Sequence, residues 1–156
     1  MSTTNYEKYT TQNPIGKWFL NNFMNTLIST VRPLNVESIL DVGTGEGFTL
    51  ARLTQEKIGK KLEGIEYLKE AIKLGKTLHP HLAIKQGTIY QLPYKDNSFE
   101  LVISTEVLEH LRDPKKGITR GYSGFKKICA PYSSKRTMVY HSTILTFEKY
   151  FAVWRS

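Results

Sequence analysis

The stretch SILDVGTGEGFTLARL, residues 38–53, combines an acid with closely spaced glycines. Asp41 ends an apolar run, and Gly43, Gly45 and Gly47 follow at every second position. Glycine lets a backbone turn sharply and lets a ligand approach it closely. Between a strand and a helix, this pattern is typical of a loop that binds a nucleotide-type cofactor, although such turns also occur without a ligand.

The spacing of these glycines discriminates between cofactors. The dinucleotide fingerprint is G-x-G-x-x-G, and its third glycine allows helix and strand to pack closely. Phe48 stands at that third position, so a diphosphate on the helix N-terminus is disfavoured. A zwitterionic amino-acid moiety with a nearby cationic centre is the alternative, because it needs no phosphate cradle.

A second acid, Glu66, closes the next apolar strand, in the sequence EGIEYLKEAI. It lies about 20 residues past the glycine loop, where a carboxylate can accept both hydroxyls of a ribose. The same residue type also favours helix N-termini, so Glu66 capping the following helix is the alternative.

The apolar pattern along the chain predicts strands that alternate with helices. The predicted helices cover residues 14–30, 48–58, 68–78 and 105–111, and the predicted strands cover residues 37–40, 61–65, 82–86 and 99–104. Such alternation indicates βαβ units around a parallel sheet. Right-handed crossovers then place the loops after the strands on one edge, where ligands bind. Trp18 and the other aromatic residues of the first helix are expected in the core.

Length and composition are those of one globular domain. The chain has 156 residues and a single cysteine, Cys129, which excludes an internal disulfide and a cysteine-based zinc site. No apolar run approaches ~18 residues, and the polar N-terminus lacks the apolar segment of a signal peptide. We therefore expect a cytoplasmic protein with no membrane partner.

Charge is distributed unevenly along the chain, whose formal net charge is +8. Residues 1–114 contain 13 Lys and Arg and 13 Asp and Glu, whereas residues 115–156 contain nine basic residues and one acid. The basic excess is confined to the last 42 residues, so we expect no specific nucleic-acid partner.

Three motifs occur in the order and at the spacing of a known family. They are ILDVGTGEG, GIEYLKEAI and QGTIYQLPYKDNSFELVISTEVLEHLRDP. Through them the chain resembles class I S-adenosylmethionine-dependent methyltransferases, in particular the methyltransferase type 11 group similar to ubiquinone- and menaquinone-biosynthesis enzymes. The resemblance covers roughly residues 5–114. It implies a Rossmann-like α/β fold, with helices on both faces of a parallel sheet in the order 3-2-1-4.

The resemblance implies S-adenosylmethionine as the cofactor and gives the matching positions roles. Glu66 would hold the ribose hydroxyls, Tyr67 would lie beside the adenine, and Thr88 and Ile89 would flank the adenine ring. The remaining expected cofactor residues surround the methionine part (Asp41, Gly43, Thr44, Gly45, Gly47) or line the floor near the sulfonium (Ser104, Thr105, Glu106).

One position departs from the family pattern. Position 88 is commonly Asp in this family, where its carboxylate accepts from the adenine amino group. Thr88 offers only a hydroxyl, so we expect weaker or less selective recognition of adenine.

The predicted helix 105–111, TEVLEHL, places Glu106, Glu109 and His110 on one face. His110 is the candidate general base for an acceptor that must lose a proton. The same three residues match the E-x-x-E-H metal set of some methyltransferases, but no convincing further ligand follows and no metal is predicted. An ordinary polar helix face is the third alternative.

The function implied is methyl transfer to a small-molecule acceptor, which the sequence does not name. The non-enzymatic alternative is a cofactor-binding remnant or interaction module that lacks an acceptor site. A nicotinamide-dependent oxidoreductase is a third option, against which the glycine spacing argues. The sequence does not predict the oligomeric state.

The chain divides after Pro114 into a methyltransferase core, 1–114, and a basic atypical tail, 115–156. In the family, a helix and a fifth strand follow this point. Permitted codons for the tail, shifted by one nucleotide, are compatible with that helix and strand, so we hypothesise a frameshift origin. The sheet would then end at the strand 99–104, as an exposed edge. In the alternative, a divergent C-terminal lobe, RTMVYHSTILTF supplies a real strand.

Overall fold

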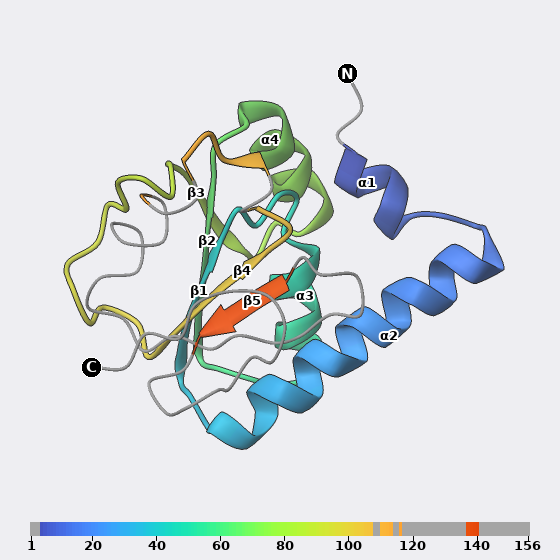
Figure 1. The fold of residues 1–156 in the computed structure, drawn as a ribbon, viewed down its shortest axis with the longest axis horizontal. Coiled ribbons are helices and arrows are strands. Elements are labelled where there is room, and N and C mark those ends of the chain that lie inside the picture. The colour runs from blue at the N-terminus through green and yellow to red at the C-terminus, as the bar shows by residue number, and fades with distance from the viewer. Residues whose placement is uncertain (1–3, 108–109, 114–115, 117–136, 141–156) are drawn as a thin grey trace.

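The computed structural model describes residues 4–107, 110–113, 116 and 137–140 and has a five-stranded sheet at its centre (Figure 1). The spatial order is β3-β2-β1-β4-β5. The strands are β1 (Ser38–Val42), β2 (Lys61–Glu66), β3 (Ala83–Gln86), β4 (Leu101–Thr105) and β5 (Thr137–Tyr140). The first four pair in parallel, which confirms the predicted α/β class and the order 3-2-1-4.

The outer strand β5 pairs with β4 in the antiparallel direction, with Val102 opposite Tyr140 and Thr105 opposite Thr137. The expectation that β4 would be left as an open edge is therefore wrong. β5 comes from the stretch RTMVYHSTILTF that the sequence offered as a strand. Residues 117–136 and 141–156 of the tail lie outside the described part, and the frameshift origin stays a hypothesis.

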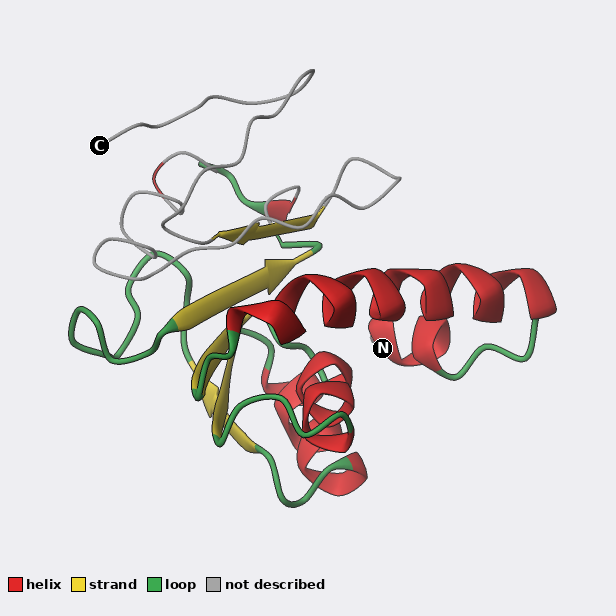
Figure 2. Ribbon diagram, turned by 90° about the horizontal axis from the view of Figure 1, so that it is seen from below, coloured by secondary structure: helices red, strands yellow, loops and turns green. Residues whose placement is uncertain are grey.

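The described helices gather on one side of the sheet (Figure 2), so the helices that the resemblance implies for the other face are not found among the described residues. The described helices are α1 (Thr4–Tyr9), α2 (Pro14–Val31), a 3-10 turn (Arg32–Leu34), α3 (Phe48–Gln55) and α4 (Lys69–Leu78). Their apolar residues form one core with Ile39, Leu101 and Ile103, which point to that side. None of these helices is long and apolar enough to span a bilayer.

The opposite side of the sheet has its own, smaller core. Leu40, Val42 and Val102, which alternate with the residues of the first core, pack there with Ile89 and Phe99. The connection between β3 and β4 therefore covers this side within the described residues. Alternation on β1 and β4 makes both faces apolar, which is the requirement of a buried parallel strand.

Helix α2 begins as the sequence predicts. The Asn13 side chain accepts from the backbone N–H of Ile15 at 2.9 Å, and Pro14 occupies the first turn, where no intrahelical N–H bond is needed. The expectation that the aromatic residues of this helix are core is wrong for its first half. Trp18 is 59 % exposed and Phe19 49 % exposed, whereas Phe23 is buried.

The predicted helix 105–111 does not form where the structure describes it. Thr105 is the last residue of β4, and Glu106 has a left-handed backbone with φ of 57°. Val107 is outside any helix, and His110 belongs to a short 3-10 turn. Glu109 lies outside the described residues. The carboxylates and imidazole are therefore not displayed along one helical face from Glu106 onward.

Glycine 75, inside α4, lets this helix approach the glycine loop. A Cβ at Gly75 would come 2.7 Å from the backbone oxygen of Glu46 and 3.0 Å from its carbonyl carbon. Both atoms belong to the backbone and cannot move aside by changing a rotamer. The contact connects the packing of α4 to the conformation of the loop.

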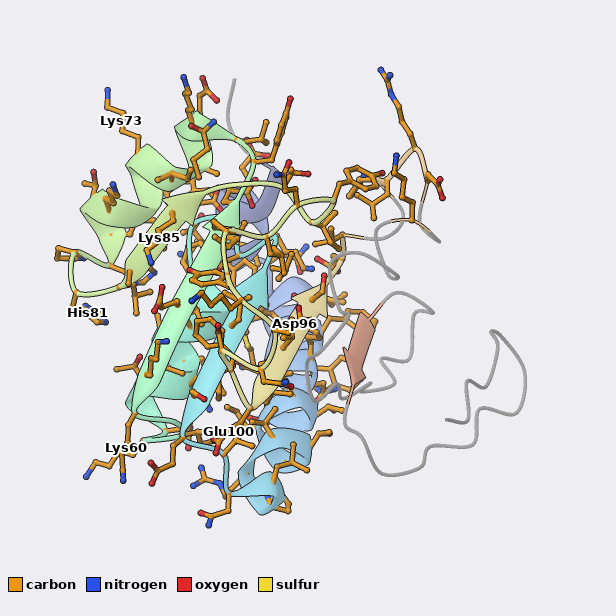
Figure 3. The ribbon with its side chains drawn as sticks, turned by 90° about the vertical axis from the view of Figure 1, so that its left-hand side faces the viewer. Lys60, Lys73, His81, Lys85, Asp96 and Glu100 are labelled. Atoms are coloured by element: carbon orange, nitrogen blue, oxygen red, sulfur yellow. The ribbon has the colours of Figure 1, made fainter. Side chains whose placement is uncertain are left out.

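We predict that Gly75→Ala destabilises the protein by about 1–3 kcal/mol, because overpacking against a backbone outweighs the gain in helix propensity. Urea unfolding followed by circular dichroism measures the change. The control is Lys73→Ala on the same helix, whose side chain points away from the body (Figure 3), and which we expect to change stability by a few tenths of a kcal/mol. A stabilised Gly75→Ala variant would contradict the close contact.

Candidate functional site

The candidate site lies where β1 and β4 end, next to the loop that leads into α3. A small cleft opens there, with a cavity volume of about 20 Å³. Eight residues from four parts of the chain line it: Tyr9, Gly43, Thr44, Glu46, Phe48, Thr49, Thr105 and Glu106. The carboxyl ends of parallel strands are the usual place for a ligand in such sheets.

The glycine loop has the backbone that only glycine adopts easily. Gly43, Gly45 and Gly47 have φ values of 78°, 57° and 87°, all in the left-handed region. A Cβ at Gly43 would also come 2.2 Å from a methyl carbon of Val107. Two features therefore favour glycine in the pattern G-x-G-x-G. All three glycines have a left-handed backbone, and Gly43 also lies close to Val107, which follows β4.

The Glu66 carboxylate accepts hydrogen bonds from backbone N–H groups of the glycine loop and of the segment that follows β2. One oxygen accepts from Gly45 N–H at 2.9 Å, and the other accepts from Tyr67 N–H at 2.7 Å and Leu68 N–H at 2.9 Å. The two latter bonds hold the segment ahead of α4, whose first residue is Lys69, and no side chain caps the helix N–H groups themselves. The carboxylate retains further acceptor capacity, because each of its oxygens has two lone pairs.

Asp41 is a buried acid without a hydrogen-bond partner. Its side chain is 1 % exposed, and neither carboxylate oxygen accepts a hydrogen bond from the described part of the chain. Burial, helped by the charge of Glu66 and opposed by the nearby Thr44 hydroxyl, raises the pKa of Asp41 to about 7. Such a group is stabilised by a cation or a donor that reaches it.

The cleft is acidic as a whole. Glu46 and Glu106 line it, and Asp41 lies behind them. Burial raises the pKa of the Tyr9 phenol above its usual range, and the charges of Glu106, Asp41 and Glu46 add to the rise. The phenol is therefore protonated and lies within the field of three carboxylates.

Helix α1 contributes to the site, which the sequence did not predict. The Tyr9 ring stacks on Phe48 with centroids 4.4 Å apart and planes 1° apart. Lys8 forms an ion pair with Glu106, 98 residues away along the chain. The stretch TNYEKY has no apolar period that marks a helix, so only tertiary contact reveals its role.

The residues expected around the adenine do not line the cleft, and neither does Ser104, which was expected near the sulfonium. Tyr67 is 71 % exposed, and Ile89 is buried in the smaller core. The Thr88 hydroxyl accepts from Tyr90 N–H at 3.3 Å within a turn. Ser104 is buried and donates to Val42 O at 3.0 Å, which joins β4 to β1. An exposed tyrosine after β2 has a free face for a planar ring, whereas Ser104 is engaged in the sheet.

The structure does not bring His110 to the cleft. Its side chain is exposed and it is not among the lining residues. Among the described residues, no three His, Cys, Asp or Glu side chains are grouped to hold a metal ion. Within the same part of the chain, no histidine lines the cleft as the expected imidazole base.

Comparison with known proteins identifies the family to which the chain is similar. The model of the family described as "Methyltransferase domain" matches residues 40–122, which include the glycine loop, Glu66 and Glu106. Norajmaline N-methyltransferase of Rauvolfia serpentina is 31 % identical over 88 residues, covering 53 % of this chain and 30 % of the relative. A probable S-adenosylmethionine-dependent methyltransferase of Mycolicibacterium smegmatis is 27 % identical over 75 residues, covering 48 % and 28 %.

Solved structures share the fold. The YcgJ protein of Bacillus subtilis superposes with a TM-score of 0.58 at 22 % identity, covering 64 % of this chain and 44 % of YcgJ. DesVI of Streptomyces venezuelae gives 0.54 at 17 % identity, covering 69 % and 45 %. The matched segment covers 30 % of the length of the Rauvolfia relative and 28 % of the Mycolicibacterium relative. With a parallel sheet in the order 3-2-1-4 and a family match over more than half of its length, this chain belongs to the methyltransferase domain family.

Proposed function

We propose that this chain binds S-adenosylmethionine in the acidic cleft and transfers its methyl group to a small-molecule acceptor. The observation that carries the proposal is the buried carboxylate of Asp41, which has no hydrogen-bond partner in the described residues and lies behind a glycine loop. A cofactor with a sulfonium and an ammonium group supplies the positive charge that this carboxylate lacks.

Charge complementarity favours this cofactor over a dinucleotide. Asp41, Glu46 and Glu106 surround or line the cleft, and a diphosphate would add two negative charges to the same place. Like charges at short range in a partly buried site repel strongly. The missing third glycine of the dinucleotide fingerprint points the same way.

Glu66 is the residue that would hold the ribose. Its oxygens are fixed by three backbone N–H groups and keep lone pairs for the hydroxyls. Gly45 donates to the same carboxylate, so the loop and the ribose acceptor are held as one unit. Tyr67, exposed directly after Glu66, would lie against the adenine.

When bound, S-adenosylmethionine supplies a methyl group attached to a sulfonium, and the neutral thioether that remains after the transfer is a good leaving group. The task of the chain is then to align an acceptor, an orientation effect worth several kcal/mol. Thr105 and Glu106 line the cleft at the end of β4, where they would orient the reacting groups. The name of the norajmaline relative supports a small-molecule acceptor.

The alternative function, a cofactor-binding protein without an acceptor site, rests on a different observation. His110, the expected general base, is exposed and is not among the residues that line the cleft. Reproducible methyl transfer to any acceptor would exclude this alternative.

Isothermal titration of S-adenosylmethionine and S-adenosylhomocysteine into the protein tests cofactor binding. We expect saturable binding of both, and Glu66→Gln should weaken both roughly tenfold because it removes charge from the ribose acceptor. Glu63→Gln is the control on the same strand, since Glu63 pairs with Lys61 and Lys85 away from the cleft. The proposal fails if neither ligand binds the wild-type protein.

The affinity for S-adenosylmethionine should rise with pH. A pKa of about 7 leaves Asp41 mostly protonated at pH 6 and mostly ionised at pH 8, and only the ionised form attracts a cation. We expect roughly a tenfold increase in affinity over that range. Asp41→Asn should bind with little pH dependence, and Glu63→Gln should keep the wild-type slope. Equal slopes for wild type and Asp41→Asn would show that another group titrates.

A further inference from the structure

Lys8 brings a positive charge of the protein itself to the cofactor cleft. Its ammonium group forms an ion pair with Glu106, and both side chains are partly buried, with 36 % and 28 % exposed. The ammonium also lies 5.7 Å from the ring centre of Phe23 and 5.8 Å from that of Tyr9. These ring contacts are within the range of cation–π attraction.

The neighbouring Tyr9 fixes the position from which Lys8 reaches Glu106. Its ring is stacked on Phe48, the first residue of α3, so α1 is attached directly beside the glycine loop. Thr49 and the acids Asp41, Glu46 and Glu106 lie near the phenol. The pair of residues Lys8 and Tyr9 thus places one cation and one neutral donor over three carboxylates.

Glu106 is a cleft residue held in an uncommon conformation. Its φ of 57° is in the left-handed region, although it is neither glycine nor asparagine. Residues kept in such regions cluster at functional sites, because the surrounding structure must enforce them. Glu106 lines the cleft together with Gly43 and Thr105, so its carboxylate is accessible to a ligand as well as to Lys8.

We propose that Lys8 is a specificity-determining residue that competes with the positive charge of the cofactor for Glu106. The inference rests on the proposed function, because it takes S-adenosylmethionine as the ligand. In the structure, the ion pair with Lys8 neutralises the charge of Glu106. The sulfonium can pair with Glu106 only when Lys8 leaves that carboxylate. S-adenosylhomocysteine has no charge on its sulfur and gains nothing from this exchange. The preference for S-adenosylmethionine over S-adenosylhomocysteine is therefore smaller in the wild-type protein than in a protein without Lys8.

The test compares the affinities of wild type and Lys8→Met for S-adenosylmethionine and S-adenosylhomocysteine by isothermal titration at pH 8. We expect Lys8→Met to bind S-adenosylmethionine roughly fivefold more tightly, which is the scale of a partly exposed ion pair. The gain for S-adenosylhomocysteine should be clearly smaller, because its sulfur carries no charge. Lys8→Arg keeps the cation and should keep the wild-type ratio of the two affinities.

Lys17→Met is the matched control, since Lys17 bonds to Gln12 on the exposed start of α2 and not to the cleft. Thermal melting of each variant confirms that it is folded. Equal gains for the two ligands in Lys8→Met would mean that α1 excludes them by bulk, and they would overturn the inference. Unchanged or weaker binding of S-adenosylmethionine would overturn it as well, while leaving the proposed function intact. Absence of binding in the wild-type protein would instead remove the proposed function and the inference with it.

Discussion

The hydrogen bond from Gly45 N–H to the carboxylate of Glu66 joins the two halves of the candidate site. Gly45 lies in the loop after β1, and Glu66 is the last residue of β2, so the bond connects the ends of adjacent parallel strands. The same carboxylate accepts from Tyr67 N–H and Leu68 N–H, in the short segment that leads into α4. A side chain at one strand end therefore sets the loop conformation, the segment ahead of a helix and the acceptor groups of the site together.

The acids of the site are not equally stabilised by the surrounding backbone. The charge of Glu66 helps to raise the pKa of Asp41, and Glu46 is also buried. Backbone N–H groups stabilise Glu66, but a buried carboxylate at Asp41 gains nothing comparable from the described residues. The protein thus keeps an electrostatic imbalance at the site, and an imbalance of this kind is a common property of ligand-binding residues.

Much of this architecture follows from the sequence, for physical reasons that can be named. Strands 38–42 and 61–66 and helices 14–31 and 69–78 carry strong apolar periodicity, and periodicity predicts elements whose burial decides their structure. Helix 105–111 was predicted from its apolar spacing but does not begin as expected, because Thr105 pairs in β4 and Glu106 turns the chain. Helix α1 is short, and only tertiary contacts distinguish it from polar connecting chain. For the same reason the sequence pointed to Gly43, Thr44 and Glu106 in the cleft but not to Tyr9 or Phe48.

The placement of β4 has a consequence for how the chain reaches its native state. Ser104 donates to Val42 O and Glu100 N–H donates to Ser38 O, so β4 is joined to β1 at both ends across 62 residues of sequence. The pairings of β1 with β2 and of β2 with β3 close much shorter loops. Loop-closure entropy disfavours the longer closure, and contacts of large sequence separation slow folding. We therefore expect residues 38–86 to assemble first and β4 to join last, with the free side of β1 the part of the nascent sheet most open to wrong pairing in the interval.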